Sequence, residues 1–152
     1  MEKHKKQIAV IGGRNASRKA LNAAETIGKL IAKNDWQLIC GGLGGIMEAA
    51  CRGARSENGT TIGIVPSNRR TDANEFVTVP VGTGLGIARN SIIAHSADGA
   101  IAIAGRYGTL SEIAYFLQLG KPVITLHCGW EVKGVFPAKS PKEAIKIIAK
   151  SL

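Results

Sequence analysis

The sequence predicts a Rossmann-like α/β domain, that is, a doubly wound and mostly parallel sheet with helices on both faces, formed by residues 1–152 as a single domain. Short apolar runs that suit buried strands alternate with longer segments of helical periodicity along almost the whole chain. Parallel strands need such crossover connections, which explains the alternation. Four of the apolar runs end in a glycine-rich turn, and ligands of parallel sheets bind at these carboxyl ends of strands.

Composition limits the class of protein. The 152 residues suit one domain, and an apolar content of 45% is typical of a globular chain. No apolar run approaches the roughly 20 residues that cross a bilayer, and the basic N-terminus lacks the features of a signal peptide, so we expect a cytoplasmic protein without membrane contact.

The cysteines and histidines do not cluster, which argues against a metal site. The net charge of +9 gathers near the ends, and with 5% aromatic residues the chain lacks a base-stacking surface, which disfavours nucleic acid as a partner.

The first half of the chain is expected to contain three strands and two helices. The strands are Gln7–Ile11, Gln37–Cys40 and Thr61–Val65, and the helices run from Asn15 or Ser17 to about Lys33 and from Ile46 to about Arg55. Asn or Ser is a favourable N-cap for the first helix. Small residues on one side of the second helix would let it lie close to the sheet. The polar segment Ser67–Glu75 has no apolar anchor, and we expect an exposed, mobile loop there.

The second half continues the alternation. The expected elements are a strand at Phe76–Val81, a helix at Leu85–Ser96, a strand at Gly99–Ala104, a helix at Thr109–Leu119 and a strand at Val123–Leu126. The last helix begins at Ser140, because a serine cap, a proline in the first turn and a glutamate three residues after the cap form a typical helix start. Residues 127–139 give no clear pattern.

The glycine-rich turns are the candidate binding elements. They lie at Gly12-Gly13, Gly41–Gly45, Gly82–Gly86 and Ala104–Glu112. The last turn opens a helix, so its backbone N–H groups and the helix dipole predict an anion site, and Tyr107 within it would border the ligand. The density of glycine at 41–45 is explained either by close helix packing or by a phosphate or ribose that approaches bare backbone, and we favour the second.

Two common nucleotide sites are excluded by spacing. A dinucleotide site needs an acidic residue at the end of the second strand, where this chain has Cys40-Gly41. A P-loop needs Gly-Lys followed by Ser or Thr, whereas the Gly-Lys pairs at 28–29 and 120–121 are followed by Leu and Pro.

Arg89 is predicted to lie on the mostly apolar stripe formed by Leu85, Ala88, Ile92 and Ile93. A charge on such a face is costly unless it is paired. Either its stem follows the core edge while its head reaches water, or its guanidinium is aimed at an anion or carboxylate in the cleft. The neighbouring glycine-rich turn favours the second interpretation.

Thr109 and Glu112 also allow two interpretations. The sequence T-x-x-E fits a capping box, in which both side chains satisfy free N–H groups at a helix start. Alternatively, Thr109 donates its hydroxyl to a phosphate, and Glu112 is a general acid/base or binds ribose. Composition does not separate these hypotheses.

The combination of GG-x-x-G-x-M-x-A-x-A, a helix-opening arginine and G-x-x-GT-x-x-E resembles the LOG-like ("Lonely Guy") superfamily, formerly labelled putative lysine decarboxylases. The resemblance extends from about Ile8 to Leu126. Within the superfamily the chain is most similar to small bacterial proteins related to the DNA-processing protein Smf and to the molybdenum cofactor carrier protein of algae.

The resemblance implies hydrolysis of a nucleoside 5′-monophosphate to free base and ribose 5-phosphate. Arg89 and Glu112 would be the catalytic pair. The remaining implied or expected ligand-binding residues are Gly12, Gly13, Gly41, Gly42, Gly44, Met47, Gly105, Arg106, Tyr107, Gly108 and Thr109. No cofactor would be required, and the ligand would be a phosphorylated small molecule. LOG-like proteins pair through helices beside the site, which implies a homo-oligomer, either a dimer or a tetramer.

The chain departs from the LOG pattern at the central turn. Ala104 stands where LOG proteins have proline, Arg106 replaces a glycine, and Asn90 replaces the lysine after the arginine. Such changes are expected in a protein that keeps the phosphate site and loses the chemistry. The alternative to an AMP-type phosphoribohydrolase is therefore a non-catalytic carrier or sensor of molybdopterin or an AMP-like nucleotide.

Overall fold

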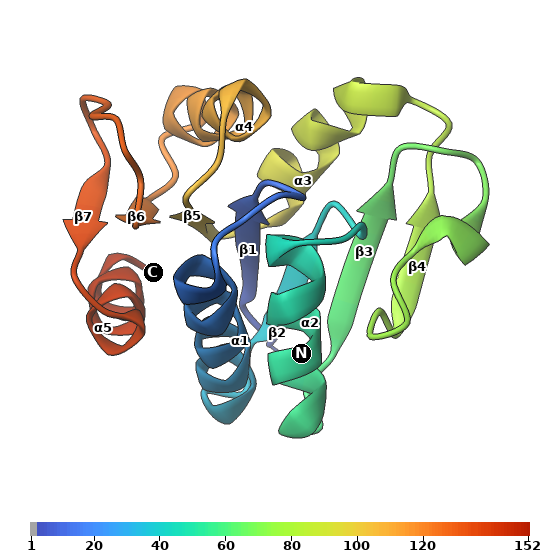
Figure 1. The fold of residues 1–152 in the computed structure, drawn as a ribbon, viewed down its shortest axis with the longest axis horizontal. Coiled ribbons are helices and arrows are strands. Elements are labelled where there is room, and N and C mark those ends of the chain that lie inside the picture. Colours follow the sequence, from blue (N-terminus) through green and yellow to red (C-terminus); the bar gives the residue numbers. More distant parts are fainter. Residues whose placement is uncertain (1–2) are drawn as a thin grey trace.

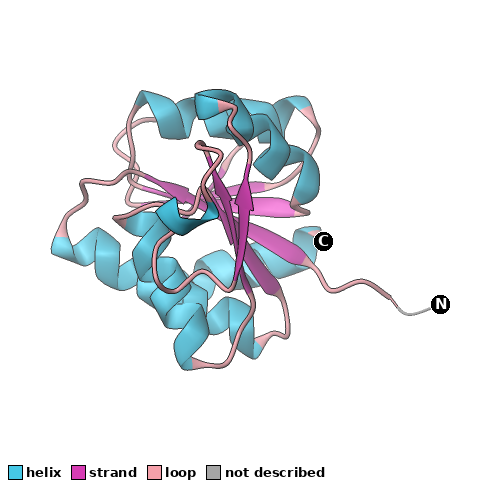
Figure 2. Ribbon diagram, turned by 90° about the vertical axis from the view of Figure 1, so that its right-hand side faces the viewer, coloured by secondary structure: helices cyan, strands magenta, loops and turns pink. Residues whose placement is uncertain are grey.

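The computed structural model describes residues 3–152, which form one parallel sheet with helices on both faces (Figure 1, Figure 2). The strands are β1 (Gln7–Gly12), β2 (Gln37–Cys40), β3 (Thr61–Val65), β4 (Val79–Gly82), β5 (Gly99–Ile103), β6 (Val123–Leu126) and β7 (Phe136–Ala138). Their order is β4-β3-β2-β1-β5-β6-β7, and each neighbouring pair is parallel. The predicted fold class is confirmed.

Within residues 3–152, five α-helices form the outer layers. They are α1 (Arg18–Lys33), α2 (Ile46–Ser56), α3 (Asn90–Ser96), α4 (Tyr107–Gln118) and α5 (Pro141–Ser151). Helices α1, α2 and α5 cover one face of the sheet, and α3 and α4 cover the other (Figure 1). Each face of the sheet has its own hydrophobic core, and successive side chains of β1 point to opposite faces. Ile8 and Val10 pack against the layer of α1, α2 and α5, while Ala9 and Ile11 pack against the layer of α3 and α4. Among residues 3–152, no helix has both the length and the apolar character to cross a membrane.

The winding reverses between β1 and β5. From β1 the chain builds β2, β3 and β4 outward on one side, and then returns to place β5 on the other side of β1. Residue Gly12 at the end of β1 is in register with Ile103 at the end of β5. The turns that follow these two strands therefore lie side by side at the topological switch point, where open α/β sheets bind ligands.

Glycines in α1 and α2 let these two helices pack closely against each other. A Cβ atom at Gly53 would collide with the carbonyl oxygen of Glu25 in α1, and one at Gly28 would collide with the carbonyl of Ala50. Both glycines therefore permit α1 and α2 to approach backbone to backbone.

The polar segment 67–75, which was expected to be an exposed loop, is mostly exposed but more ordered than the sequence indicated. The segment contains a short 3-10 helix, η1 (Arg70–Asp72). Near its C-terminal end, Asn74 is hydrogen-bonded to the turn that follows β2. The backbone N–H of Asn74 donates to Gly42 O at 2.8 Å, and its side-chain amide donates to Leu43 O at 2.9 Å. Polar hydrogen bonds replace apolar packing here.

Three further elements differ from the prediction. The fourth strand begins at Val79 rather than Phe76, and β7 was not predicted at all. The expected helix at 85–96 is divided into a 3-10 helix, η2 (Gly86–Arg89), followed by α3. As a result Leu85 and Ala88 are exposed instead of facing inward, whereas Arg89 and Ile93 are buried as predicted.

Candidate functional site

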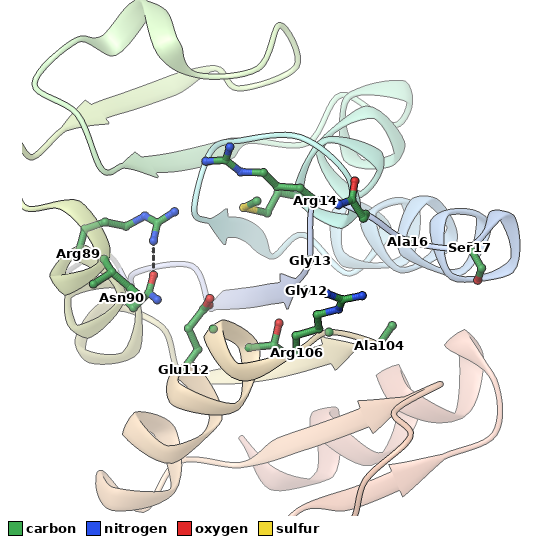
Figure 3. A pocket seen from close by; sticks show the side chains of 16 residues that line it. Gly12, Gly13, Arg14, Ala16, Ser17, Arg89, Asn90, Ala104, Arg106 and Glu112 are labelled. Carbon is green, nitrogen blue, oxygen red and sulfur yellow. Dashed lines mark hydrogen bonds between the residues drawn. The ribbon is translucent and has the colours of Figure 1, made fainter.

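A pocket of about 540 Å³ opens where the carboxyl ends of β1 and β5 meet (Figure 3). Its walls are the turn after β1, the start of α2, the junction of η2 with α3, and the turn from β5 into α4. Of the residues assigned to the site from the sequence, the pocket brings together Gly12, Gly13, Met47, Arg89, Gly105, Arg106, Gly108, Thr109 and Glu112.

The turn after β1 is fixed by close backbone packing. A Cβ atom at Gly12 would lie 2.7 Å from Ile103 O and 2.6 Å from the Ile46 side chain, so only glycine fits. The carbonyl of Gly13 accepts a hydrogen bond from Ile46 N at 3.1 Å, which joins the turn to the start of α2. Ser17 then caps α1 by accepting from Ala20 N at 3.1 Å. This turn is therefore anchored at both of its ends.

The turn from β5 into α4 has an unusual backbone. Ala104 and Gly105 both adopt positive φ angles, of 50° and 102°. A Cβ atom at Gly105 would collide with the Thr109 side chain, so glycine is required there on two grounds. The first intrahelical bond runs from Leu110 N to Arg106 O at 2.9 Å. The N–H groups of residues 107–109 have no helical partner and form the positive end of the helix dipole at the pocket wall.

The structure contradicts the capping-box interpretation of Thr109 and Glu112. Helix α4 begins two residues before Thr109, its N-cap is Arg106, and no side chain caps it. Thr109 is only 4% exposed, and its hydroxyl forms no hydrogen bond with any part of the chain that the structure describes. Every fully buried side-chain nitrogen or oxygen atom within residues 3–152 has a hydrogen-bond partner. The Thr109 hydroxyl has none, so it is not fully buried, and the pocket that Thr109 lines gives access to it.

Glu112 presents a free carboxyl group to the pocket. The residue is half-buried, and within residues 3–152 its carboxyl has neither a hydrogen-bond partner nor an ion pair. Burial raises the pKa of this carboxyl from its ordinary value of 4.5 to about 7, although the positive charge of Arg89 acts in the opposite direction. Glu112 can therefore hold or release a proton near neutral pH, as a general acid/base must.

Arg89 lies opposite Glu112 and is held by the backbone. Its Nε donates to Ile64 O at 2.8 Å, its Nη2 donates to Gly41 O at 3.4 Å, and its Nη1 donates to Asn90 Oδ1 (Figure 3). The residue is 8% exposed and lines the pocket, which favours the interpretation in which its guanidinium is aimed into the cleft. Burial lowers the pKa of the guanidinium, and the nearby Glu112 raises it. Three of its five N–H donors are used, which leaves two for a ligand.

The charges of the pocket favour an anion. Arg14, Arg89 and Arg106 all line it, and Glu112 is its sole acidic residue. None of the three arginines forms an ion pair with any residue from 3 to 152. The surplus of positive charge, together with the start of α4, suits a phosphate or another oxyanion.

Comparison with known proteins identifies the family of the chain. The family model of the SLOG cluster4 family, a part of the LOG-like superfamily, matches residues 5–151. The chain belongs to the SLOG cluster4 family. An uncharacterized protein of Archaeoglobus fulgidus is 41% identical over 140 residues, which cover 91% of each chain.

Several solved structures are similar to this SLOG chain over most of its length. The molybdenum cofactor binding protein of Rippkaea orientalis has a TM-score of 0.92 and 36% identity, with 98% of both chains covered. The molybdenum cofactor carrier protein of Chlamydomonas reinhardtii has a TM-score of 0.90 and 31% identity, over 97% of this chain and 98% of that one. DNA processing protein A of Streptococcus pneumoniae shares the fold alone, with a TM-score of 0.74 and 20% identity over 93% of this chain and 61% of that one.

Four residues assigned to the site from the sequence lie outside the SLOG protein's main pocket. Gly41 lies beneath Arg89, where a Cβ atom would be 2.7 Å from Nη2, so it makes room for the guanidinium. Gly42 faces Val65 and receives the hydrogen bond of Asn74. Gly44 lines a separate hollow of about 410 Å³, and Tyr107 lines another of about 390 Å³. The turn at Gly82–Gly86 also lies outside the pocket.

Sequence reasoning missed several lining residues. Arg14, Asn15 and Asn90 line the pocket, but only the glycines of the first turn had been assigned to it. The position of Arg14 and Asn15, directly after a strand-end Gly-Gly, was the available signal. Among residues 3–152, no group of three or more His, Cys, Asp or Glu side chains could hold a metal ion.

Proposed function

We propose that this protein binds a phosphorylated pterin-type ligand of the molybdenum cofactor class and carries it without converting it. The observation that carries the proposal is the arginine-rich pocket at the switch point, in a chain that is 31–36% identical to a molybdenum cofactor binding protein and a carrier protein over nearly their whole lengths. The molybdenum of such a ligand would be cargo.

The donor groups of the pocket suit the phosphate of this ligand. The free N–H groups at the start of α4 and the guanidinium groups of Arg14, Arg89 and Arg106 are all donors, which a phosphate needs. The Thr109 hydroxyl adds a neutral donor, and the Glu112 carboxyl can accept from a hydroxyl or an N–H group of the ligand. The volume of about 540 Å³ lies within the roughly 300–1,000 Å³ of small-molecule sites.

A loading experiment tests the carrier function. The protein is mixed with molybdenum cofactor released from a denatured molybdoenzyme and is then separated by gel filtration under anaerobic conditions. We expect molybdenum and pterin to elute with the protein in about equal amounts. Gly105→Ala, whose added methyl would collide with the Thr109 side chain and displace the turn at the start of α4, should lose both. Elution of all molybdenum and pterin in the small-molecule fraction would contradict the proposal.

A second candidate function is supported by Glu112. A carboxyl with a pKa of about 7 that faces a buried arginine could protonate the departing base or activate water in hydrolysis of a nucleoside 5′-monophosphate. The N-glycosidic bond would break, water would add to C1 of the ribose, and the base would leave with a proton.

Chromatography of the protein incubated with a panel of nucleoside 5′-monophosphates tests this candidate. Free base that appears with the wild type and is absent with Glu112→Gln would support it. A stable Glu112→Gln protein with full turnover would remove Glu112 from the mechanism, and the absence of base release by the wild type would leave the carrier function alone.

A further inference from the structure

A second hollow of about 390 Å³ adjoins the main pocket. It is lined by Gly105, Arg106, Tyr107, Leu110 and Trp130. Gly105 and Arg106 also line the main pocket, so the two cavities share the turn from β5 into α4 as a common wall. A ligand anchored in the main pocket that passes over this shared turn would reach the second hollow.

The start of α4 presents a different face to each cavity. Thr109 and Glu112, which are three residues apart and therefore neighbours on the helix, line the main pocket. Tyr107 and Leu110, with the same spacing, line the second hollow. Trp130, from the segment between β6 and β7, completes it. A polar cavity and an apolar, aromatic cavity are thus arranged along one helix.

The chemistry of the second hollow differs from that of an anion site. Tyr107 is 88% exposed, although a tyrosine ring normally gains stability from burial, and Leu110 is 36% exposed. Trp130 offers a second aromatic surface, and Arg106 is exposed and forms no ion pair within residues 3–152. Aromatic faces and an arginine plane are groups on which flat heteroaromatic rings stack.

We propose that this hollow, formed by Arg106, Tyr107, Leu110 and Trp130, binds the planar heteroaromatic ring of the ligand whose phosphate occupies the main pocket. The inference rests on the proposed binding of a phosphorylated ligand. It adds that the protein also recognises a second part of that ligand, a planar heteroaromatic ring. The occupant follows from the wall that the two cavities share at Gly105 and Arg106, because a ligand anchored by its anion in the arginine-rich pocket would have its ring beside the aromatic hollow.

Tryptophan fluorescence can report on this hollow. The chain has two tryptophans, Trp36 and Trp130. Trp36 immediately precedes β2 and so lies at the amino ends of the strands, whereas both cavities are at the carboxyl ends. The variant Trp36→Phe therefore leaves Trp130 as the only indole, placed in the proposed ring site.

The experiment titrates the Trp36→Phe protein with GMP, whose ring shares the 2-amino-4-oxopyrimidine unit of pterins, and with ribose 5-phosphate, which has no ring. Calorimetry measures both affinities, and chromatography checks that GMP stays intact. We expect GMP to quench Trp130 emission. Ribose 5-phosphate should bind more weakly and leave the emission unchanged.

Substitutions separate the two cavities. Tyr107→Ala should weaken GMP binding about tenfold, since stacking of one base on one aromatic side chain contributes roughly 1–3 kcal/mol. The affinity for ribose 5-phosphate should not change. Tyr107 is too exposed for this substitution to disturb folding, and Tyr115→Ala, at an exposed tyrosine of α4 outside the hollow, is the matched control that should change neither affinity.

The outcomes distinguish failure of each proposal. If neither GMP nor ribose 5-phosphate binds, the phosphorylated-ligand proposal fails, and the ring site fails with it. If both bind with equal affinity and Tyr107→Ala changes neither, the ring site is refuted while the anion pocket stands. If Trp130 emission changes with protein concentration and not with GMP, a second copy of the chain covers the hollow, which also refutes the ring site.

Discussion

Glu112→Gln should stabilise the protein at neutral and alkaline pH. The pKa of Glu112 is raised by burial from 4.5 to about 7, so the folded state resists ionisation of this carboxyl. At pH 4 the group is mostly protonated in both folded and unfolded chains, so it has little effect on stability. As the pH rises above 4.5, the unfolded chain ionises first, and the wild type loses stability until the folded pKa of about 7 is passed. A shift of this size corresponds to roughly 3 kcal/mol.

Urea unfolding of both proteins between pH 4 and pH 8.5 measures this effect. The difference in unfolding free energy should be close to zero at pH 4, should grow through pH 5–7 in favour of Glu112→Gln, and should stay constant above about pH 8. Groups common to both proteins cancel in the difference. Glu75→Gln, at an exposed carboxylate in the segment before β4, is the control. A difference that stays flat with pH, or that favours the wild type at pH 8, would refute the reasoning.

Four other substitutions, one of them a matched control, test the local structure by urea unfolding. Arg89→Lys should lower the free energy of unfolding by about 2 kcal/mol, because lysine cannot form both of the hydrogen bonds that Arg89 donates to Ile64 O and Gly41 O. Unchanged stability would contradict these hydrogen bonds. Gly105→Ala should cost roughly 1–3 kcal/mol because of its positive φ and the contact with Thr109, whereas Gly108→Ala, with nothing within 4 Å of the added methyl, should cost nothing; equal effects would refute this contrast. Ser140→Ala should cost about 1 kcal/mol by removing the cap that accepts from Glu143 N, and no loss would contradict the cap.

The fold was predictable because its signals are local. Three expected strands, Gln37–Cys40, Thr61–Val65 and Val123–Leu126, match β2, β3 and β6 to the residue, since each is a short apolar run between polar breaks. The strand β7 was missed because its three residues, Phe136–Ala138, are too few to show alternation and include a proline. The attachment of segment 67–75 was missed because it depends on Asn74 reaching backbone groups more than 30 residues away.

The candidate site was only partly predictable. The burial of Arg89 follows from its position between apolar residues, but its partners, the carbonyls of Ile64 and Gly41, become visible only when β2 and β3 are placed. The T-x-x-E pattern at Thr109 suggested a cap, and the structure differs because the positive φ angles of Ala104 and Gly105 start the helix two residues earlier. The aromatic hollow could not be predicted, since Trp130 comes from a segment without a recognisable pattern.

Mass spectrometry of the protein's bound ligand tests the central claim most directly. The protein is purified from a host that makes the molybdenum cofactor, and its mass is measured under native conditions before and after mild collisional activation. We predict a bound, releasable species that contains both a pterin ring and a phosphate, and its loss in Gly105→Ala. A wild-type protein that carries no such species, and that instead releases free base from nucleoside 5′-monophosphates, would contradict the account.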